Sequence, residues 1–544
     1  MFVHKKILSS LVLAFTLLFF YLYGLGNRPF ATPDEGRYVE IPREMVHSKD
    51  WLTPRLNGIK YFEKPPLFYW MQATAIKFLG TNEFFMRLWT VFFALFGCLA
   101  TYHFARRFYS HEVGLFSAFV LGTSVLYFSL GRLIILDMPV SILSTLSLFS
   151  FFHGFHETRP IYRRLWFYAF SVFCALGVLT KGIMTLAIAG PIIVAWLTIM
   201  GNWGALRPLY LPSSLFLFLI VAAPWHIWVS LENPEFPHKY FIVEHVLRYT
   251  TNIHLRTKPF YFFVPVLFLG ALPWIFFLPQ ALKQTYKKKP VDSFLTIWML
   301  WVFVFFSLSN SKLVPYILPM FPPLSLCLGA YLFSYYEGHA KEKISITSFR
   351  VFGLISPIIY AFITQYTDTF VGKESVHPYA IALVIIFSLT AFISFFIHSA
   401  KKHVLALAVA SVSVVFVLIK AAPHVQRPSI KEFAQYINQH KKPDHTVVSF
   451  MAYYQDLPVY TQGIVTVIEA KGELEFGTEV ENVTNWMIPV HMFQTMWEKP
   501  NSTLWIVGRK TEIEAYQKNH PAFTPTLIAE NHGNVLMKMG TDLP

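Results

Sequence analysis

Two adjacent carboxylates followed by an arginine occur in the segment Thr32-Pro33-Asp34-Glu35-Gly36-Arg37-Tyr38. Carboxylates of this kind can act on a polar reacting group while a guanidinium holds an anion. Acidic residues are also common in the first turn of a helix, where they face the positive end of the helix dipole. Asp34 and Glu35 are therefore candidate catalytic residues, and Arg37 is a candidate substrate-binding residue, with an ordinary helix start as the alternative.

A second group of polar residues, Glu63-Lys64-Pro65-Pro66, lies within an aromatic stretch. The two prolines restrict the backbone, so that the ammonium of Lys64 can be aimed at a phosphate. The alternative is a lysine that reaches the membrane surface from an aromatic interface belt. Lys64 is thus a candidate phosphate ligand.

Isolated ionisable residues in apolar surroundings form a third group. Asp137 stands in such a setting, where a charge is costly and is usually functional or paired, and Arg132 is an available partner. Lys181 lies between two apolar runs and is either a site residue or a turn lysine. Lys312 and Tyr316 could face a phosphate, with a lysine that snorkels to the interface as the alternative.

A histidine in the segment Val243-Glu244-His245-Val246-Leu247-Arg248 is a candidate metal ligand. Glu244 and His245 diverge on a helix, so a metal site would need a further ligand, which Glu63 or Asp34 could supply. A single histidine is more often a hydrogen-bonding residue. A divalent metal such as zinc is therefore one of two hypotheses for His245.

The elements that must position these residues are membrane-spanning helices. The chain of 544 residues is 54% hydrophobic and 14% charged, which is too apolar for soluble domains of this length. A span needs about 20 mostly apolar residues. Thirteen segments are candidate spans, with boundaries soft by several residues, at roughly 7–26, 86–105, 113–131, 138–155, 165–180, 182–200, 211–229, 261–279, 292–308, 314–336, 351–364, 378–398 and 403–422.

The distribution of charge predicts the orientation of these spans. Lys and Arg gather in every second loop, which is the pattern of loops on the cytoplasmic side. With the N-terminus inside, an odd number of spans places the tail outside. All candidate residues named above then lie on the outer side, where carboxylates and fixed cations together suit a phosphate-linked substrate.

Domain organisation follows from the same pattern. Residues 1–422 are expected to form a transmembrane domain with outer loops at 27–85 and 230–260, and residues 423–544 a small soluble α/β domain outside. Residues 38–47 and 67–78 of the first loop have the pattern of helices that lie along the membrane interface. In the tail, a helix is expected at 429–440 and strands at 446–453, 463–468, 503–507 and 535–539.

Several functional classes lose support from composition. The formal net charge is +14, but the last 122 residues hold 10 Lys and Arg against 13 Asp and Glu, so the basic excess belongs to the membrane part. Nucleic acid is therefore not an expected partner. The three cysteines lie far apart in apolar runs and indicate neither disulfides nor a thiolate metal site. Nucleotide-binding and Ser-His-Asp motifs are absent from the sequence.

Several longer motifs resemble those of one enzyme family. These are PDEGRYVEIPREM, DWLTPRLNGIKYFEKPPLFYW, LDMP, VEHVLRY, KPFYFFVPVLFLGALPWIFFLP and SKLVPYILP. Together they resemble the 4-amino-4-deoxy-L-arabinose lipid A transferases, membrane glycosyltransferases of the GT-C type related to the protein O-mannosyltransferases. The ordered matches run from residue 1 to about 330. Two departures are Gly36, where the family often has Thr, and Pro66-Leu67-Phe68.

The resemblance implies a reaction and a set of roles. Members of the family move a sugar from undecaprenyl phosphate to a lipid A phosphate at the periplasmic face of the bacterial inner membrane. It implies that Asp34 is the acidic residue nearest the chemistry and that Asp137 is a second acidic residue. It further implies that the donor phosphate is held by Lys64, Arg248, Lys312 and Tyr316, and that a metal contacts Glu63 and His245.

Two other functional classes remain as alternatives. A transporter or flippase could bind a phosphate-bearing lipid through the same residues, and a GT-C relative could glycosylate proteins instead. An acceptor phosphate is already nucleophilic, so an enzyme mainly has to align it and to stabilise the departing lipid phosphate. If the acceptor were a hydroxyl, a general base would matter more, and Asp34 is the expected one.

Overall fold

The chain divides into two compact units in the computed structural model. The helical unit comprises Met1–Leu25 and Arg87–Val425, and the mixed unit comprises Gly26–Met86 and Gln426–Pro544. The segment expected as the first outer loop therefore packs with the tail. The structure describes residues 2–201, 203–204, 210–247, 250–251, 257–285, 289–340, 344–366, 373–425, 429–470, 472–499 and 502–540.

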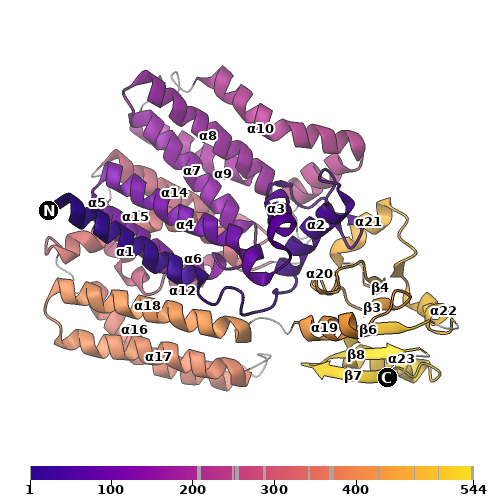
Figure 1. Cartoon of the computed structure of the whole chain (residues 1–544). Coiled ribbons are helices and arrows are strands. Elements are labelled where there is room, and N and C mark those ends of the chain that lie inside the picture. The colour runs from indigo at the N-terminus through magenta and orange to yellow at the C-terminus, as the bar shows by residue number, and fades with distance from the viewer. Residues whose placement is uncertain are drawn as a thin grey trace. The chain divides into compact units, whose positions relative to one another are not determined.

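The helical unit contains long helices that lie side by side (Figure 1). Its α-helices are α1 (Phe2–Leu22), α4 (Glu83–Phe108), α5 (His111–Thr123), α6 (Val125–Leu130), α7 (Asp137–His156), α8 (Pro160–Lys181), α9 (Met184–Met200), α10 (Leu211–Glu232), α12 (Phe263–Gly270), α13 (Leu278–Thr285), α14 (Pro290–Leu308), α15 (Phe321–Tyr336), α16 (Ile344–Tyr366), α17 (Lys373–Phe396) and α18 (Ala400–Val425). A π-helix, η2 (His238–Leu247), and three 3-10 helices, η3 (Phe260–Phe262), η4 (Trp274–Phe277) and η5 (Val314–Met320), join them.

Each of the thirteen expected spans coincides with a helix or with consecutive helices. Within the described part of the chain, nine helices are by themselves long and apolar enough to cross a membrane. Lys6–Leu22 and Met184–Met200 are shorter apolar helices. The expected span 261–279 is bent by 107° between Phe260–Gly270 and Trp274–Gln284, and the span 113–131 is divided between α5 and α6. The structure therefore supports a polytopic helical protein without confirming the number thirteen.

Burial separates central helices from peripheral ones. In the apolar 18-residue stretch of α7, 89% is buried inside the protein, whereas in the corresponding stretch of α17 only 17% is buried. Exposed apolar side chains such as Phe392 on α17 and Phe216 on α10 are what helices present to lipid. The helix that begins at Asp137 is thus held by protein on nearly all sides, which suits a residue with a precise position.

The expected partner of Asp137, Arg132, has a different set of contacts. Its guanidinium donates to the carbonyl oxygens of Phe20, Tyr21 and Tyr23 at 2.5, 2.8 and 2.8 Å. These carbonyls belong to the last turn of α1 and the residue after it, where helix carbonyls lack intrahelical partners. Arg132 therefore satisfies the end of the first helix.

The mixed unit combines helices with a six-stranded sheet. Its helices are α2 (Asp34–Ser48), α3 (Leu67–Leu79), α19 (Lys431–His440), α20 (Leu457–Thr461), α21 (Glu475–Val480), α22 (Phe493–Trp497) and α23 (Lys510–Asn519), with 3-10 helices η6 (Gly472–Leu474) and η7 (Val490–Met492). Its strands are β1 (Arg55–Leu56), β2 (Ile59–Lys60), β3 (Thr446–Phe450), β4 (Thr466–Ile468), β5 (Met487–Ile488), β6 (Leu504–Arg509), β7 (Thr526–Asn531) and β8 (Asn534–Met539).

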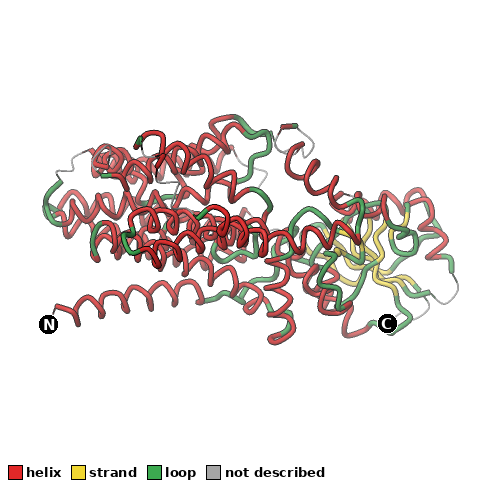
Figure 2. Tube along the Cα trace, turned by 90° about the horizontal axis from the view of Figure 1, so that it is seen from above, coloured by secondary structure: helices red, strands yellow, loops and turns green. Residues whose placement is uncertain are grey.

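The large sheet has the order β5-β4-β3-β6-β8-β7, and its strands lie side by side (Figure 2). β5, β4, β3 and β6 are parallel, whereas β8 pairs antiparallel with β6 and β7. Alternate residues of β6 enter two apolar cores, Ile506 in one and Trp505 in the other. The first core contains residues of α22 and α23, and the second contains residues of α19 and α20. This alternation is the period of two that a strand covered on both faces requires.

Helix α2 is buried in the mixed unit rather than half exposed like an interfacial helix. Eleven of its fifteen residues, from Glu35 to Met45, are buried, and it packs against α3, β1 and α20. At Gly36, a Cβ atom would come within 2.7 Å of the backbone at Gln455 and Asp456. Gly36 therefore permits a close approach of α2 to the segment that precedes α20.

Asp456, in that same segment, should make the order of the mixed unit depend on pH. Its side chain is fully buried and accepts a hydrogen bond from Ser429 Oγ at 3.1 Å, and burial raises its pKa to about 7. The native state therefore binds the proton more tightly than the unfolded state. The resulting stabilisation is complete below the unfolded pKa, near 3.8, and is lost as the pH rises through 7.

We expect Asp456→Asn to remove this dependence. Between pH 5 and pH 8, wild type should lose up to about 3 kcal/mol of local stability relative to the variant, because the two pKa values separate the states over about two pH units of this range. Hydrogen–deuterium exchange of the amides of α20 in the intact protein measures the difference, since both proteins share the intrinsic pH dependence of exchange. An equal change of protection in the two proteins would show that Asp456 does not titrate in this range.

Candidate active site

The two adjacent carboxylates of α2 differ in their surroundings. Glu35 is fully buried. Its carboxylate accepts hydrogen bonds from both terminal nitrogens of Arg28, at 2.7 and 3.1 Å, and from the backbone N–H of Ala31 at 2.8 Å. These contacts hold the chain that enters α2. The side chain of Asp34, by contrast, is 55% exposed and is open to a substrate.

Arg37 connects Asp34 to the C-terminal part of the mixed unit. Its guanidinium donates to the carboxylates of both Asp34 and Glu473, and it lies 3.4 Å from the Tyr61 hydroxyl. Burial acts to lower the pKa of Arg37, but Tyr61, Glu473 and Asp34 raise it well above its usual value. Arg37 is therefore a permanent cation held between two carboxylates, which fixes the direction of Asp34.

The lysine of the Glu63-Lys64-Pro65-Pro66 segment is folded back on its own chain. Lys64 Nζ donates to the carbonyl oxygen of Glu63 at 2.7 Å, and α3 begins directly after Pro66. Both charged side chains are partly exposed. The prolines thus set Lys64 just before the start of α3, on the same unit as Asp34.

In the helical unit, three of the residues with expected roles meet. Lys181 Nζ lies 2.6 Å from Asp137 Oδ1, and it also lies 4.9 Å from the centre of the Tyr316 ring. The side chains of Lys181 and Asp137 are only 11% and 17% exposed. The first residue of α7, the last residue of α8 and the 3-10 helix η5 therefore form one polar cluster in apolar surroundings.

Lys312 lies in the short loop before η5. It is buried, its ammonium donates to the carbonyl oxygen of Ser309, and burial lowers its pKa. Tyr316 follows one turn later and is also buried. A buried ammonium that already holds one carbonyl is rigidly placed, which is what a phosphate ligand needs.

His245 lies on the π-helix η2 and points at the turn between α8 and α9. Its Nδ1 donates to the carbonyl oxygen of Tyr240 at 2.6 Å, so Nε2 carries the lone pair. A Cβ atom added at Gly182 would lie only 1.9 Å from His245 Nε2. The imidazole ring therefore occupies the space that a side chain at this position would need. Gly182 follows Lys181, so His245 lies beside the Asp137–Lys181 pair. π-Helical turns often mark functional sites.

Gly182→Ala should therefore disturb the site directly. The backbone at Gly182 has φ 73° and ψ −151°, a region that is essentially restricted to glycine, and the new methyl group would displace the His245 ring. We expect a loss of about 1–3 kcal/mol in stability and a fall in activity. Thermal unfolding and transfer assays measure the two effects. Gly190→Ala is the matched control, because no atom lies within 4 Å of a Cβ at Gly190; equal behaviour of both variants would contradict this packing.

Arg248, the metal site and two unexpected partners complete the comparison with the sequence. Arg248 lies outside the residues that the structure describes. Among the described residues, no group of three or more His, Cys, Asp or Glu could hold a metal ion. Glu473 was not expected to take part, because it is separated from Arg37 by more than four hundred residues of sequence and no local motif marks it. Lys181 was noticed as an isolated lysine, but not as the partner of Asp137.

The fold and these polar clusters define a polytopic membrane glycosyltransferase of the GT-C type. A model of the dolichyl-phosphate-mannose-protein mannosyltransferases matches residues 7–282, and a model of the aminoarabinose transferase C-terminal domain matches residues 433–536. The undecaprenyl phosphate-α-4-amino-4-deoxy-L-arabinose arabinosyl transferase of Shewanella sediminis is 31% identical over 392 residues, 70% of each chain. The chain belongs to this aminoarabinose transferase family.

Solved structures agree with this assignment. The crystal structure of ArnT from Cupriavidus metallidurans bound to undecaprenyl phosphate has a TM-score of 0.87 and 26% identity, and the match covers 97% of each chain. The oligosaccharyltransferase of Archaeoglobus fulgidus shares the fold at a TM-score of 0.52 and 11% identity, covering 93% of this chain and 69% of that one. The fold class expected from the sequence is thereby confirmed.

Proposed function

We propose that this protein transfers 4-amino-4-deoxy-L-arabinose from undecaprenyl phosphate to a phosphate of lipid A. The observation that carries the proposal is the match over 97% of the chain to a family member bound to undecaprenyl phosphate. The gathering of basic residues in every second loop, the pattern of cytoplasmic loops, supports a multi-pass protein of the bacterial inner membrane with the reaction on the opposite, periplasmic side.

The reaction we propose is an in-line displacement at the anomeric carbon. An oxygen of the acceptor phosphate forms the new bond to this carbon as the bond to the undecaprenyl phosphate oxygen breaks. The electron pair of the broken bond leaves with the lipid phosphate, and the configuration at the anomeric carbon is inverted. Alignment and stabilisation of the departing charge are therefore the main tasks of the protein.

The side chains divide these tasks. Asp34 faces the reacting sugar and takes any remaining proton from the acceptor phosphate. Arg37 and Glu473 are positioning residues for Asp34. Glu35 stabilises the chain that enters α2 through its ion pair with Arg28. Lys64, Arg248, Lys312 and Tyr316 hold the donor phosphate. Asp137 holds Lys181 in place beside Tyr316.

We further propose that Glu63 and His245 bind a divalent metal, preferably zinc. His245 fits a ligand role, because a histidine that donates Nδ1–H to a carbonyl presents a fixed Nε2 lone pair. The assignment of Glu63 rests on the family resemblance. Such an ion would add positive charge near a substrate phosphate, and with few protein ligands it would be held weakly.

Metal analysis of purified His245→Ala beside wild type tests this assignment. Zinc content should fall in the variant, whereas His226→Ala, which removes another histidine bound to a helix carbonyl, should retain it. Equal zinc content in wild type and His245→Ala would remove His245 from the site. Transfer activity is expected to survive mild chelation, because Lys64 and Lys312 also oppose phosphate charge.

A reconstituted assay tests the proposed function itself. Purified protein receives undecaprenyl-phosphate-linked aminoarabinose and lipid A, and mass spectrometry measures the added sugar. Product in detergent supports an enzyme and excludes a flippase, which would need a bilayer to act. Mass spectrometry of lipid A and of secreted proteins from a deletion strain separates lipid from protein acceptors. Unchanged lipid A together with lost protein glycosylation would overturn the acceptor assignment.

A further inference from the structure

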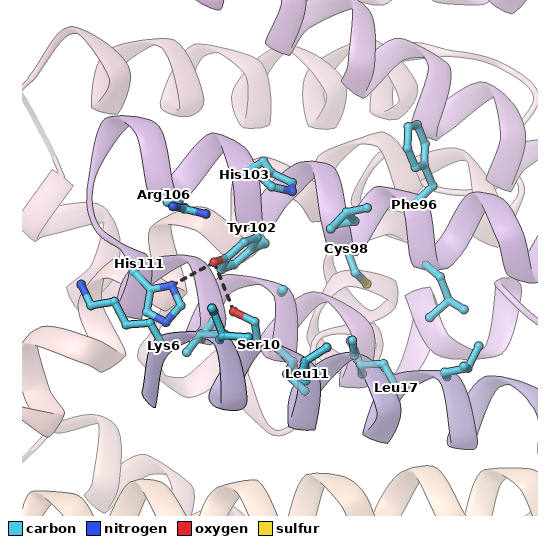
Figure 3. A pocket seen from close by; sticks show the side chains of 18 of the residues that line it. Lys6, Ser10, Leu11, Leu17, Phe96, Cys98, Tyr102, His103, Arg106 and His111 are labelled. Atoms are coloured by element: carbon cyan, nitrogen blue, oxygen red, sulfur yellow. Dashed lines mark hydrogen bonds between the residues drawn. The ribbon is translucent and has the colours of Figure 1, made fainter. Parts of the chain in front are cut away.

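A cavity of about 820 Å³ in the helical unit is lined by none of the candidate site residues discussed above. It is bounded by α1, α4 and α5, and side chains along its length are mostly apolar (Figure 3). Leu17 and Phe96 lie toward one end, and Lys6, Arg106 and His111 lie toward the other (Figure 3). The cavity thus joins an apolar trough to a basic end.

The basic end is an ordered polar group rather than a set of loose surface charges. The Tyr102 hydroxyl lies 2.9 Å from His111 Nδ1 and 3.2 Å from Ser10 Oγ, and Ser9 Oγ lies 3.3 Å from His111 Nε2. The Tyr102 hydroxyl thus stands between Ser10 and His111 (Figure 3). These contacts fix the hydroxyl and imidazole groups in one network that uses their own hydrogens, so a phosphate at this end would be met by the cations that line it.

The charge at this end is positive. Lys6 and Arg106 line it, and Glu112, 3.5 Å from Lys6, offsets one of the two charges. Both side chains of that ion pair are about half exposed, so the attraction between them is weak. Lys6 begins the first span and Arg106 ends the second, and the distribution of basic residues places both at the cytoplasmic surface. Phosphate headgroups lie at this depth.

We propose that this cavity binds an anionic phospholipid of the phosphatidylglycerol type. Its phosphodiester lies against Lys6 and Arg106, and an acyl chain lies along the trough past Leu17 and Phe96. A purely apolar lipid contact would explain the trough but not the two cations at its end. Basic pockets between spanning helices at the cytoplasmic face are suited to such headgroups. The Asp137–Lys181 cluster is expected at the other membrane surface, so this site does not hold the sugar donor.

Lipid titration followed by native mass spectrometry tests the proposal. The intact protein in neutral detergent is mixed with phosphatidylglycerol or, separately, with phosphatidylcholine. We expect phosphatidylglycerol to bind in preference, and we expect Lys6→Gln and Arg106→Gln each to weaken it about fivefold. Arg107→Gln is the matched control, because Arg107 is adjacent and exposed but does not line the cavity.

A cavity-filling variant tests the trough separately from the charges. Ala14 lines the trough and is exposed, so Ala14→Trp should fill the space without disturbing a buried core and should weaken phosphatidylglycerol binding. Equal binding of the two phospholipids would overturn the proposal, and so would an equal loss in Arg106→Gln and Arg107→Gln. Displacement of phosphatidylglycerol by undecaprenyl phosphate at equal concentration would also overturn it, since the site would then belong to the carrier lipid.

Discussion

Replacing Asp34 by Asn is expected to lower sugar transfer by about 10² to 10⁴-fold, with folded protein still in the membrane. The substitution keeps the shape of the side chain and removes its charge. Asp34 is the exposed member of the acidic pair, and it is aimed by Arg37, which is itself held by Glu473. The initial rate of transfer from the carrier lipid to lipid A measures the effect, and Asp444→Asn, which removes an exposed carboxylate of the C-terminal domain, should leave it unchanged.

The contact between Arg37 and Glu473 gives a second, graded test of the same arrangement. Glu473→Gln should reduce kcat less than Asp34→Asn does, because Arg37 keeps its contact with Asp34. A folded Asp34→Asn protein with wild-type turnover would show that the first turn of α2 is only a helix start. In that case the catalytic carboxylate would have to be sought elsewhere, with Asp137 as the next candidate.

Much of the fold could be predicted because its elements are long and strongly patterned. An apolar run of about 20 residues has few alternatives to a spanning helix, and each expected span coincides with helical structure. The strands β3, β4, β6 and β8 were also expected, since they are short apolar runs between turn residues. β5 and β7 were missed, the first because it has two residues and the second because half of its six residues are polar and it lies unburied at the sheet edge.

The partners within the site could not be predicted to the same degree. Asp137 and Lys181 were both noticed as charges in apolar surroundings, but their pairing depends on how α7 packs against α8. Arg132, which is closer in sequence, instead donates to carbonyls at the end of α1. Glu473 lies in an acidic stretch of the tail that has no motif. The sequence identifies charged residues that stand in apolar surroundings, where burial of a charge is costly. Tertiary packing decides which residues they contact.

Gly36 shows how a departure from a family pattern acquires a reason. The family often has Thr at this position, next to the candidate catalytic residues, so the difference raises the question whether the donor and the acceptor are the same as in the family. In the structure, a Cβ atom at Gly36 would collide with backbone atoms of Gln455 and Asp456, and backbone cannot move aside as a side chain can. The glycine is therefore explained by the close packing of α2 against the C-terminal domain, and it gives no evidence for a different sugar.

Replacing Lys64 by Ala is expected to lower the rate of transfer by about 10² to 10³-fold. Its ammonium is held by the carbonyl of Glu63 at a proline-restricted helix start, so it meets a phosphate without first being ordered. Negative charge grows on the lipid phosphate as the bond to the sugar breaks. A cation already in place stabilises that charge more than it stabilises the intact donor, so kcat should fall more than donor affinity does.

Steady-state rates and equilibrium binding of the donor lipid separate these two effects. Lys64→Arg keeps the charge and should recover part of the rate, although a guanidinium has a different shape and hydrogen-bond geometry. Lys77→Ala removes an exposed lysine in the last turn of α3, the helix that follows Lys64, and should behave as wild type. If Lys64→Ala instead weakened donor binding and left kcat intact, Lys64 would act in recruiting the lipid, and the stabilisation of its leaving phosphate would fall to the other cations, Lys312 first among them.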